Sequence, residues 1–83
     1  MSLEDKTLAM QVRKTIVKTP LDITMLDVAA RKGVVELTGS VRKPNDHAGA
    51  TLDLRAELKK LVEHARNTRG VTDVYADRVR IIE

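Results

Sequence analysis

The chain has 83 residues, of which 42% are hydrophobic and 33% charged, the composition of one small globular domain spanning residues 1–83. Its formal charge of +3 is weaker than the basic stripe of a typical nucleic-acid-binding protein, and Tyr75 is its only aromatic residue. Because the chain has no cysteine, thiol catalysis, disulfides and cysteine-based zinc sites are excluded. We therefore expect a single domain that does not bind nucleic acid.

The first predicted element is a helix that begins near Asp5, the expected N-cap. Apolar residues recur every four positions and form one stripe: Leu8, Val12 and Ile16. Residues 1–4 would then be a disordered tail or an added starting sequence. Pro20 ends the helix, because the residue before a proline is pushed away from helical geometry.

The next two elements are predicted strands joined by a tight turn. Alternate residues are apolar from 26 to 30 and again from 35 to 41, the pattern of strands with one buried face. Between these runs, Gly33 is expected to take the positive φ that other residues resist, so the pair predicts a β-hairpin. Gly39 falls on the inward face, where we expect a helix to approach the sheet too closely for a side chain.

A long loop and a second helix follow the hairpin. Residues 42–52 are rich in turn-forming residues and exceed the ~4–6 residues typical of connections in compact domains. The helix after them, capped by Thr51 or Asp53, has an apolar stripe: Leu54, Leu58, Leu61, Val62 and Ala65. Gly70 ends this helix.

The final run, residues 71–82, is rich in β-branched residues and predicts a third strand. Val74 is out of phase with Val79 and Ile81, so a bulge is expected near Ala76-Asp77.

The order α-β-β-α-β predicts an α+β fold in which two helices pack on one face of a three-stranded mixed sheet. The third strand either pairs in parallel with the second or is separated from it by the first. The opposite face of the sheet would be polar and available for solvent or self-association. Its expected residues are Val34, Glu36, Thr38, Ser40, Arg78 and Arg80.

The stretch from Gly33 to Gly39 does not match a phosphate-binding loop. Such a loop follows the pattern G-x-x-x-x-G-K-[ST], whereas here five residues separate the glycines and Ser40 and Val41 follow. The residues between the glycines favour a paired strand, whose amides are used in the ladder. The sequence therefore predicts structural roles for Gly33, Gly39 and Gly70.

No catalytic or metal-binding set is predicted. His47 and His64 are the only imidazoles, and their separation of seventeen positions fits no metal motif. Ser2 and Ser40 both lack an adjacent pair of histidine and acid. We therefore expect no enzymatic activity, no cofactor and no small-molecule substrate.

Basic residues on and near the second helix form the candidate contact site: Arg42, Lys43, Arg55, Lys59 and Lys60. Together they could attract anionic lipid headgroups, at about 1 kcal/mol for each residue near a charged membrane. Glu57 and Glu63 count against such a patch, and the alternative is a set of ordinary solubilising charges. The loop at 42–52 is either part of an interface or an idle insertion.

Several short motifs follow one another in a fixed order: Leu26-x-Val28-x-Ala30, Gly33, Val35-x-Leu37-x-Gly39-x-Val41 and Gly70-Val71-x-x-Val74. In this order and spacing the chain resembles the BON domain family (bacterial OsmY and nodulation domains), and the resemblance covers nearly the whole chain. Two features depart from the family pattern. The loop at 42–52 looks like an insertion, and the last strand is one residue longer between Val74 and Val79.

The resemblance implies a non-enzymatic module that binds phospholipid membrane surfaces in the bacterial envelope or periplasm. The alternative is a protein-interaction or oligomerisation module that acts through the open sheet face or an edge strand. The expected partner is therefore an anionic phospholipid surface, another protein or a second copy of the chain. The sequence as given shows no signal peptide, so a cytoplasmic location stays open.

Overall fold

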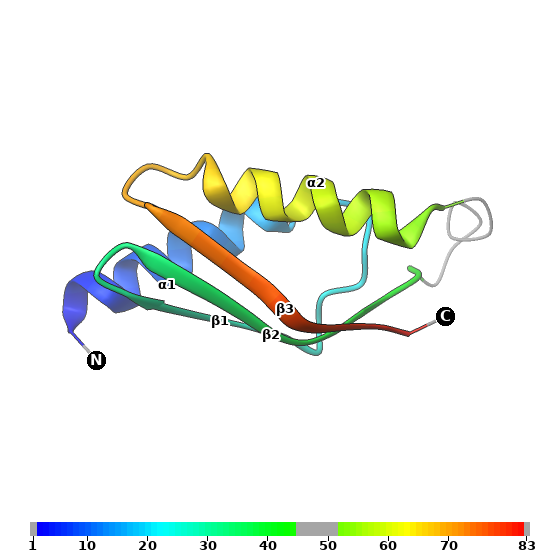
Figure 1. Ribbon diagram of the computed structural model, residues 1–83, viewed down its shortest axis with the longest axis horizontal. Helices are drawn as coiled ribbons and strands as arrows, with labels where there is room; N and C mark the ends of the chain where they lie inside the picture. The colour runs from blue at the N-terminus through cyan, green and yellow to red at the C-terminus, as the bar shows by residue number, and fades with distance from the viewer. Residues whose placement is uncertain (1, 45–51, 83) are drawn as a thin grey trace.

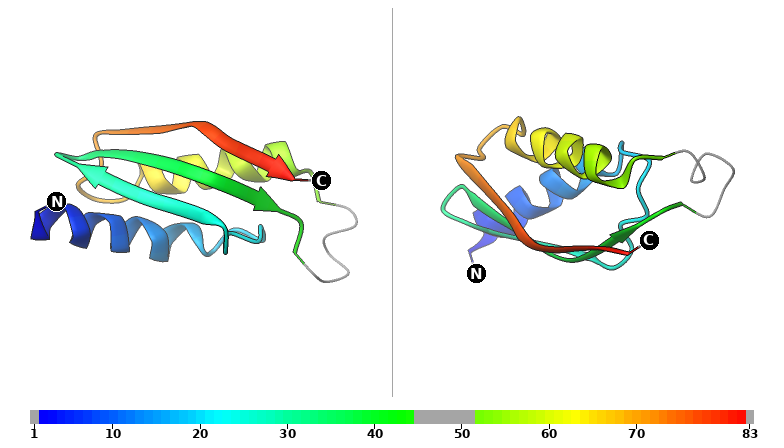
Figure 2. Two further views of the ribbon diagram at one scale, coloured as in Figure 1. Left: turned by 90° about the horizontal axis from the view of Figure 1, so that it is seen from below. Right: turned by 45° about the vertical axis from the view of Figure 1, so that its right-hand side comes forward.

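The computed structural model describes residues 2–44 and 52–82 and has two layers, a pair of helices and a sheet (Figure 1). The elements are α1 Leu3–Ile16, β1 Leu26–Arg31, β2 Val34–Arg42, α2 Leu54–Arg66 and β3 Asp73–Ile82. Both helices lie on one face of the three-stranded sheet, and no other described element covers the opposite face (Figure 2). The predicted α+β fold is confirmed.

The strand order of the sheet is β1-β2-β3, so β2 is the central strand. It pairs antiparallel with β1 through the hairpin and parallel with β3, which the chain reaches through α2. The third strand therefore lies directly beside the second, which is one of the two arrangements that the sequence left open.

The core fills the space between the helices and the inner face of the sheet. Its largest side chains that are at most 1% exposed are Val12, Ile16, Leu26, Val35, Leu37, Val41 and Leu61. Burial of each such side chain stabilises the fold by about 1.5–3 kcal/mol. The apolar stripes of both helices therefore pack on the alternate apolar residues of the strands, as their spacing predicts.

Helix α1 begins earlier than the sequence pattern predicted. Its N-cap is Ser2, whose hydroxyl oxygen accepts a hydrogen bond from the backbone N–H of Asp5 at 3.1 Å. The prediction of Asp5 as the N-cap is therefore wrong, and residues 2–4 belong to the helix and its cap rather than to a tail. Asp5 instead accepts a hydrogen bond from the backbone N–H of Lys32 at 3.1 Å, which ties the start of α1 to the hairpin turn.

The hairpin turn consists of Lys32 and Gly33, whose φ angles are 52° and 86°. Positive φ at both central residues defines a type I′ turn, whose twist matches that of the flanking strands. The carbonyl oxygen of Gly33 accepts a hydrogen bond from the backbone N–H of Thr72 at 2.8 Å. The turn is therefore held on one side by α1 and on the other by the segment that enters β3.

Gly39 has a φ of 99°, a conformation that side chains disfavour, and its backbone lies against that of Met25. The carbonyl oxygen of Met25 accepts a hydrogen bond from the backbone N–H of Ser40 at 3.1 Å. A Cβ atom at position 39 would overlap this same carbonyl oxygen. The expectation that a helix excludes a side chain here is therefore wrong, because the obstacle is the backbone that leads into β1.

A bulge interrupts the pairing of β3 with β2. Glu36 is level with Tyr75 and Thr38 with Arg78, so two steps along β2 correspond to three along β3. The extra residue lies at Ala76-Asp77, where the change of phase in the sequence predicted it.

Replacement of Gly39 by alanine should destabilise the domain by about 3 kcal/mol, because the new methyl group both strains φ and overlaps the Met25 carbonyl. Gly70→Ala is the matched control. Its φ of 96° is equally unfavourable, but the added Cβ would meet only the flexible end of Leu8, so about 1 kcal/mol should be lost. Denaturant unfolding followed by circular dichroism measures both. Equal losses would show that the approach of Met25 does not constrain position 39.

Candidate binding surfaces

One side of α1 exposes large apolar side chains to solvent. Leu3 is 80% exposed, Met10 62% and Val17, the C-cap residue, 56%. They recur every seven residues, which is close to two turns of a helix with ~3.6 residues per turn, so they form one line. Exposed lysines lie along the same side: Lys6, Lys14 and Lys18. We call this set of six residues the α1 outer face.

Val12 and Ile16 on the opposite side of α1, together with Arg13 beside the outer face, hold the helix against the sheet. Val12 and Ile16 are fully buried on that side. The guanidinium of Arg13 donates hydrogen bonds to the carbonyl oxygens of Leu26 at 2.8 Å and Ile23 at 3.3 Å. Arg13 is therefore used to attach the helix, whereas the neighbouring lysines project into solvent.

The sequence pattern alone did not reveal the α1 outer face. Met10 and Val17 lie outside the predicted stripe of Leu8, Val12 and Ile16, and Leu3 falls in the predicted tail. The seven-residue spacing is present in the sequence. It becomes informative only when the opposite side of the helix is known to be buried.

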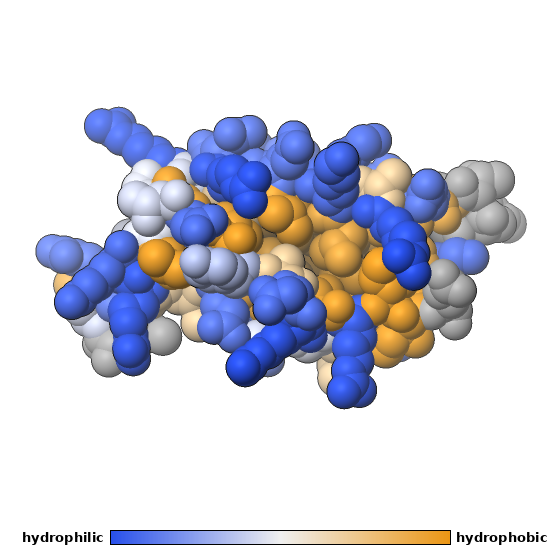
Figure 3. Space-filling model, in the orientation of Figure 1, coloured by the Kyte–Doolittle hydropathy of each residue, from blue (hydrophilic) through white to orange (hydrophobic). Residues whose placement is uncertain are grey.

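The predicted basic residues lie at the end of β2 and in the first two turns of α2. Arg42 ends β2, Lys43 follows it, and Arg55 lies in the first turn of α2 at the same end (Figure 1). Lys59 and Lys60 lie one turn further along α2. All five are exposed, and hydrophilic side chains gather over the outer surface of α2 (Figure 3).

Two of these five cations have acidic partners. The Nε of Arg42 lies 2.8 Å from the Oδ2 of Asp22, and the Nζ of Lys60 lies 3.4 Å from the Oε1 of Glu57. Among the described residues, no carboxylate lies within 4 Å of the cations of Lys43, Arg55 or Lys59. Residues 45–51, which form most of the predicted loop, lie outside the described residues.

Asp22 and Arg42 join the segment before β1 to the end of β2. Their backbones exchange hydrogen bonds of 2.9 and 3.3 Å, beside the ion pair of their side chains. The backbone N–H and the hydroxyl of Thr24 donate to the Oδ1 of Asp22 at 3.0 and 2.7 Å. These bonds, with the smaller contribution of Arg42, lower the pKa of Asp22 from 3.8 to about 2.

The outward face of the sheet carries the residues expected from their alternation. Arg78 lies level with Thr38 and Arg80 with Ser40, and Arg78 makes a long ion pair of 3.9 Å with Glu36. Tyr75 is 51% exposed and Ile82 50%. Hydrogen bonding to Asp73 raises the pKa of the Tyr75 phenol above its usual value, so the ring is neutral at physiological pH. The face is therefore mixed, with arginines and a few exposed apolar groups.

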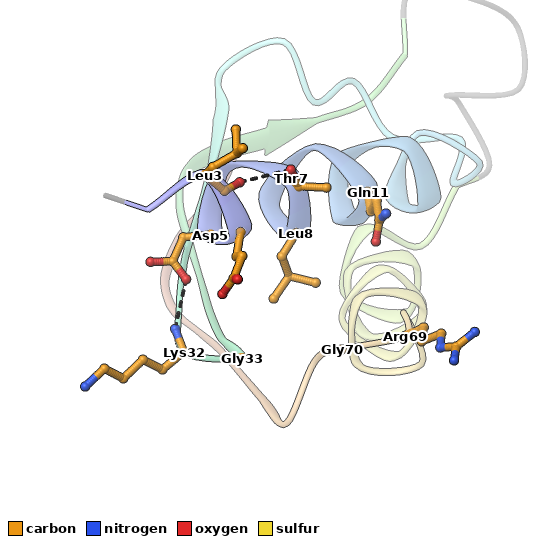
Figure 4. Close-up of a pocket in the computed structure, with 10 residues that line it drawn as sticks. Leu3, Asp5, Thr7, Leu8, Gln11, Lys32, Gly33, Arg69 and Gly70 are labelled. Carbon is orange, nitrogen blue, oxygen red and sulfur yellow. Dashed lines mark hydrogen bonds between the residues drawn. The ribbon is translucent and has the colours of Figure 1, made fainter.

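A surface hollow lies where the start of α1 meets the hairpin turn and the turn before β3 (Figure 4). Leu8 points into it, and the side chains of Lys32 and Arg69 point away from its centre. The hydrogen bond from the Lys32 backbone lowers the pKa of Asp5, which keeps this carboxylate ionised. The hydroxyl of Thr7, which also lines the hollow, donates a hydrogen bond to the carbonyl oxygen of Leu3 at 2.9 Å.

The residues considered for chemistry do not assemble into a site within the part of the chain that the structure describes. No group of three or more His, Cys, Asp or Glu residues there could hold a metal ion. His64 is exposed on α2, Ser2 caps α1 and Ser40 lies on β2, while His47 falls outside the described residues. None of the described helices has the length and apolar character needed to span a bilayer.

The carboxylate of Asp22 should stabilise the domain most above pH 4 and progressively less as the pH falls to 2. A carboxyl with a lowered pKa stabilises the folded state only while it is ionised. Its protonation as the pH falls from 3.8 to about 2 removes this contribution. We therefore expect Asp22→Asn to be less stable than the natural chain at pH 6, with a difference that shrinks towards zero near pH 2. Denaturant unfolding at a series of pH values measures it. A difference that stays constant over this range would mean that the charge of Asp22 has no role.

The comparisons with known proteins agree with the resemblance seen in the sequence motifs. The sequence profile of the BON domain matches residues 4–83, essentially the whole chain. No curated protein sequence matches the chain. BON domains are generally non-catalytic binding modules. From α1 to the end of β3, the chain belongs to the BON domain family.

Proposed function

We propose that this protein is a non-enzymatic module that binds the surface of anionic phospholipid membranes through the α1 outer face. The observation that carries the proposal is the line of exposed apolar residues, Leu3, Met10 and Val17, with lysines on either side of it. A helix that combines apolar side chains with lysines suits the boundary between headgroups and acyl chains.

The two kinds of side chain on this face would act differently. Each lysine near an anionic membrane contributes about 1 kcal/mol of attraction, which salt weakens. The apolar side chains would leave water on entering the interface, and this contribution does not depend on salt. Two acidic residues lie near this face in the sequence, Glu4 and Asp5. Glu4 is exposed, whereas the carboxylate of Asp5 accepts a hydrogen bond from the backbone N–H of Lys32.

The basic residues near α2 are the second candidate contact with lipid: Arg42, Lys43, Arg55, Lys59 and Lys60. They have less support, because Arg42 and Lys60 are paired with Asp22 and Glu57. The outer surface of α2 is also mostly hydrophilic and offers no exposed apolar residue as large as Met10 (Figure 3).

Association with another protein through the open sheet face or an edge strand is the second candidate function. The exposed side chains of Tyr75 and Ile82 on that face favour it.

The triple variant Lys6→Gln, Lys14→Gln and Lys18→Gln should bind vesicles containing phosphatidylglycerol about 100-fold more weakly at low salt, because three attractive charges are lost. The matched control, Arg55→Gln, Lys59→Gln and Lys60→Gln, removes as many charges from α2 and should bind nearly as well as the natural chain. Co-sedimentation with vesicles measures both. If only the α2 variant loses vesicle binding, the membrane contact lies on α2 and not on α1. If the natural chain does not bind anionic vesicles, the proposal of membrane binding is wrong.

Met10→Ser should weaken vesicle binding about tenfold at both low and high salt, since burial of an apolar side chain is not screened. Met10 is 62% exposed, so the domain itself should keep its stability. Ala56→Ser, on the exposed side of α2, is the control for the added hydroxyl. If Met10→Ser binds like the natural chain, contact with the membrane involves only charges.

A further inference from the structure

The two edges of the sheet differ in their accessibility. α1 runs along β1: Arg13 donates to the carbonyl oxygen of Leu26, Asp5 accepts from the N–H of Lys32, and Ala30 is only 3% exposed. No described element lies beyond β3, whose ten residues form the longest strand (Figures 1 and 2). An edge strand of this kind presents a row of N–H and C=O groups that another strand can pair with.

The pairing of the sheet shows which backbone groups of β3 point outward. Ser40 and Arg42 direct their backbone groups to the β1 side, where they bond Met25 and Asp22. The backbone N–H and C=O groups of Val41, which lies between them, therefore point to β3. In a parallel ladder these groups bond the residues on either side of the partner residue, Ile81. Ile81, and Val79 two residues before it, thus direct their N–H and C=O groups to the free edge.

The side chains around this edge differ on its two sides. On the open face, Arg78 and Arg80 project beside the edge, and the ion pair that Arg78 makes within the described residues is the long 3.9 Å contact with Glu36. On the helix side, half-buried hydrophobic residues of α2 and β3 pack against the core: Leu58, Val62, Ala76, Val79 and Ile81. Figure 3 shows apolar surface gathered between α2 and β3, bordered by hydrophilic side chains.

We propose that the free edge of β3 binds an extended segment of another protein, in which acidic and apolar residues alternate. The segment would add a fourth strand beside Val79 and Ile81 through backbone hydrogen bonds. Its acidic side chains, level with Arg78 and Arg80, would lie on the open face, and its apolar side chains would lie against the band between α2 and β3. This site rests on the second candidate function and does not depend on membrane binding.

The charges argue against a second copy of the chain as the occupant. Antiparallel pairing of two β3 strands centred on residue 78, 79 or 80 places an arginine opposite an arginine on the same face. Like charges directly opposite each other destabilise a pair of strands. Asp77, at the bulge, would repel an acidic side chain of the partner. The acidic residues of the bound segment should therefore lie beside the part of β3 that follows Asp77.

The test uses a nine-residue peptide in which glutamate and valine alternate, and a counterpart in which lysine replaces glutamate. The glutamate peptide should bind and shift the amide NMR signals of Val79 and Ile81, with slower hydrogen exchange at both amides, while the lysine peptide should bind about tenfold more weakly. The double variant Arg78→Glu and Arg80→Glu should reverse this preference. It should leave vesicle binding through α1 unchanged.

Two variants of Ile81 distinguish the contribution of its backbone N–H to peptide binding from that of its side chain. Ile81→Pro removes an outward N–H without touching the ladder to β2, so both peptides should lose binding, whereas Ile81→Ala retains the N–H and should keep most of it. Amide spectra of each variant establish that it is folded. Failure of the folded natural chain to bind the glutamate peptide would overturn the proposal. So would peptide-induced shifts away from β3, or a dimer in sedimentation that involves the β3 amides.

Discussion

The arrangement of the molecule depends on the central strand β2, which is buried on one face only. Val35, Leu37 and Val41 are fully buried beneath the helices, while Glu36, Thr38 and Ser40 alternate with the inward positions and face outward. A chain of 83 residues has too little apolar material to cover a second face of the sheet, since small domains bury a smaller share of their surface. Both helices therefore gather on one side. No described element covers the outward face of the sheet or the edge formed by β3.

Helix α1 has different roles on its two sides, and this division matters more than the net charge of +3. Its inner side carries Val12 and Ile16, and the guanidinium of Arg13, beside the outer face, reaches the segment at the start of β1. The lysines of the α1 outer face are displayed together with its exposed apolar side chains. A modest total charge can in this way produce a local surface that suits an anionic membrane.

The position of α1 also explains why the sheet has one covered edge and one free edge. Contacts of Asp5 and Arg13 hold α1 along β1, and α2 packs on the inner face of the sheet, so no described element lies beyond β3. The bulge at Ala76-Asp77 adds a further effect, because it shifts the alternation of every later residue in β3. Without the extra residue, Arg78 and Arg80 would point towards the helices and Val79 towards solvent.

The sequence alone determined the order of the elements, the hairpin turn at Gly33 and the bulge in β3. These features follow from local backbone geometry, which repeats along a helix or strand and can be read from the spacing of apolar residues. The family resemblance was also visible in the motifs, and it extends over residues 4–83.

Only the tertiary structure decided that β3 pairs directly with β2, that Met25 rather than a helix excludes a side chain at Gly39, and that Asp22 binds Arg42 twenty residues away. The same holds for the α1 outer face and the free edge of β3. Each of these depends on which distant segments pack together. Contacts of this kind are determined when distant segments pack together in the core. The periodicity of apolar residues within one segment carries no information about them.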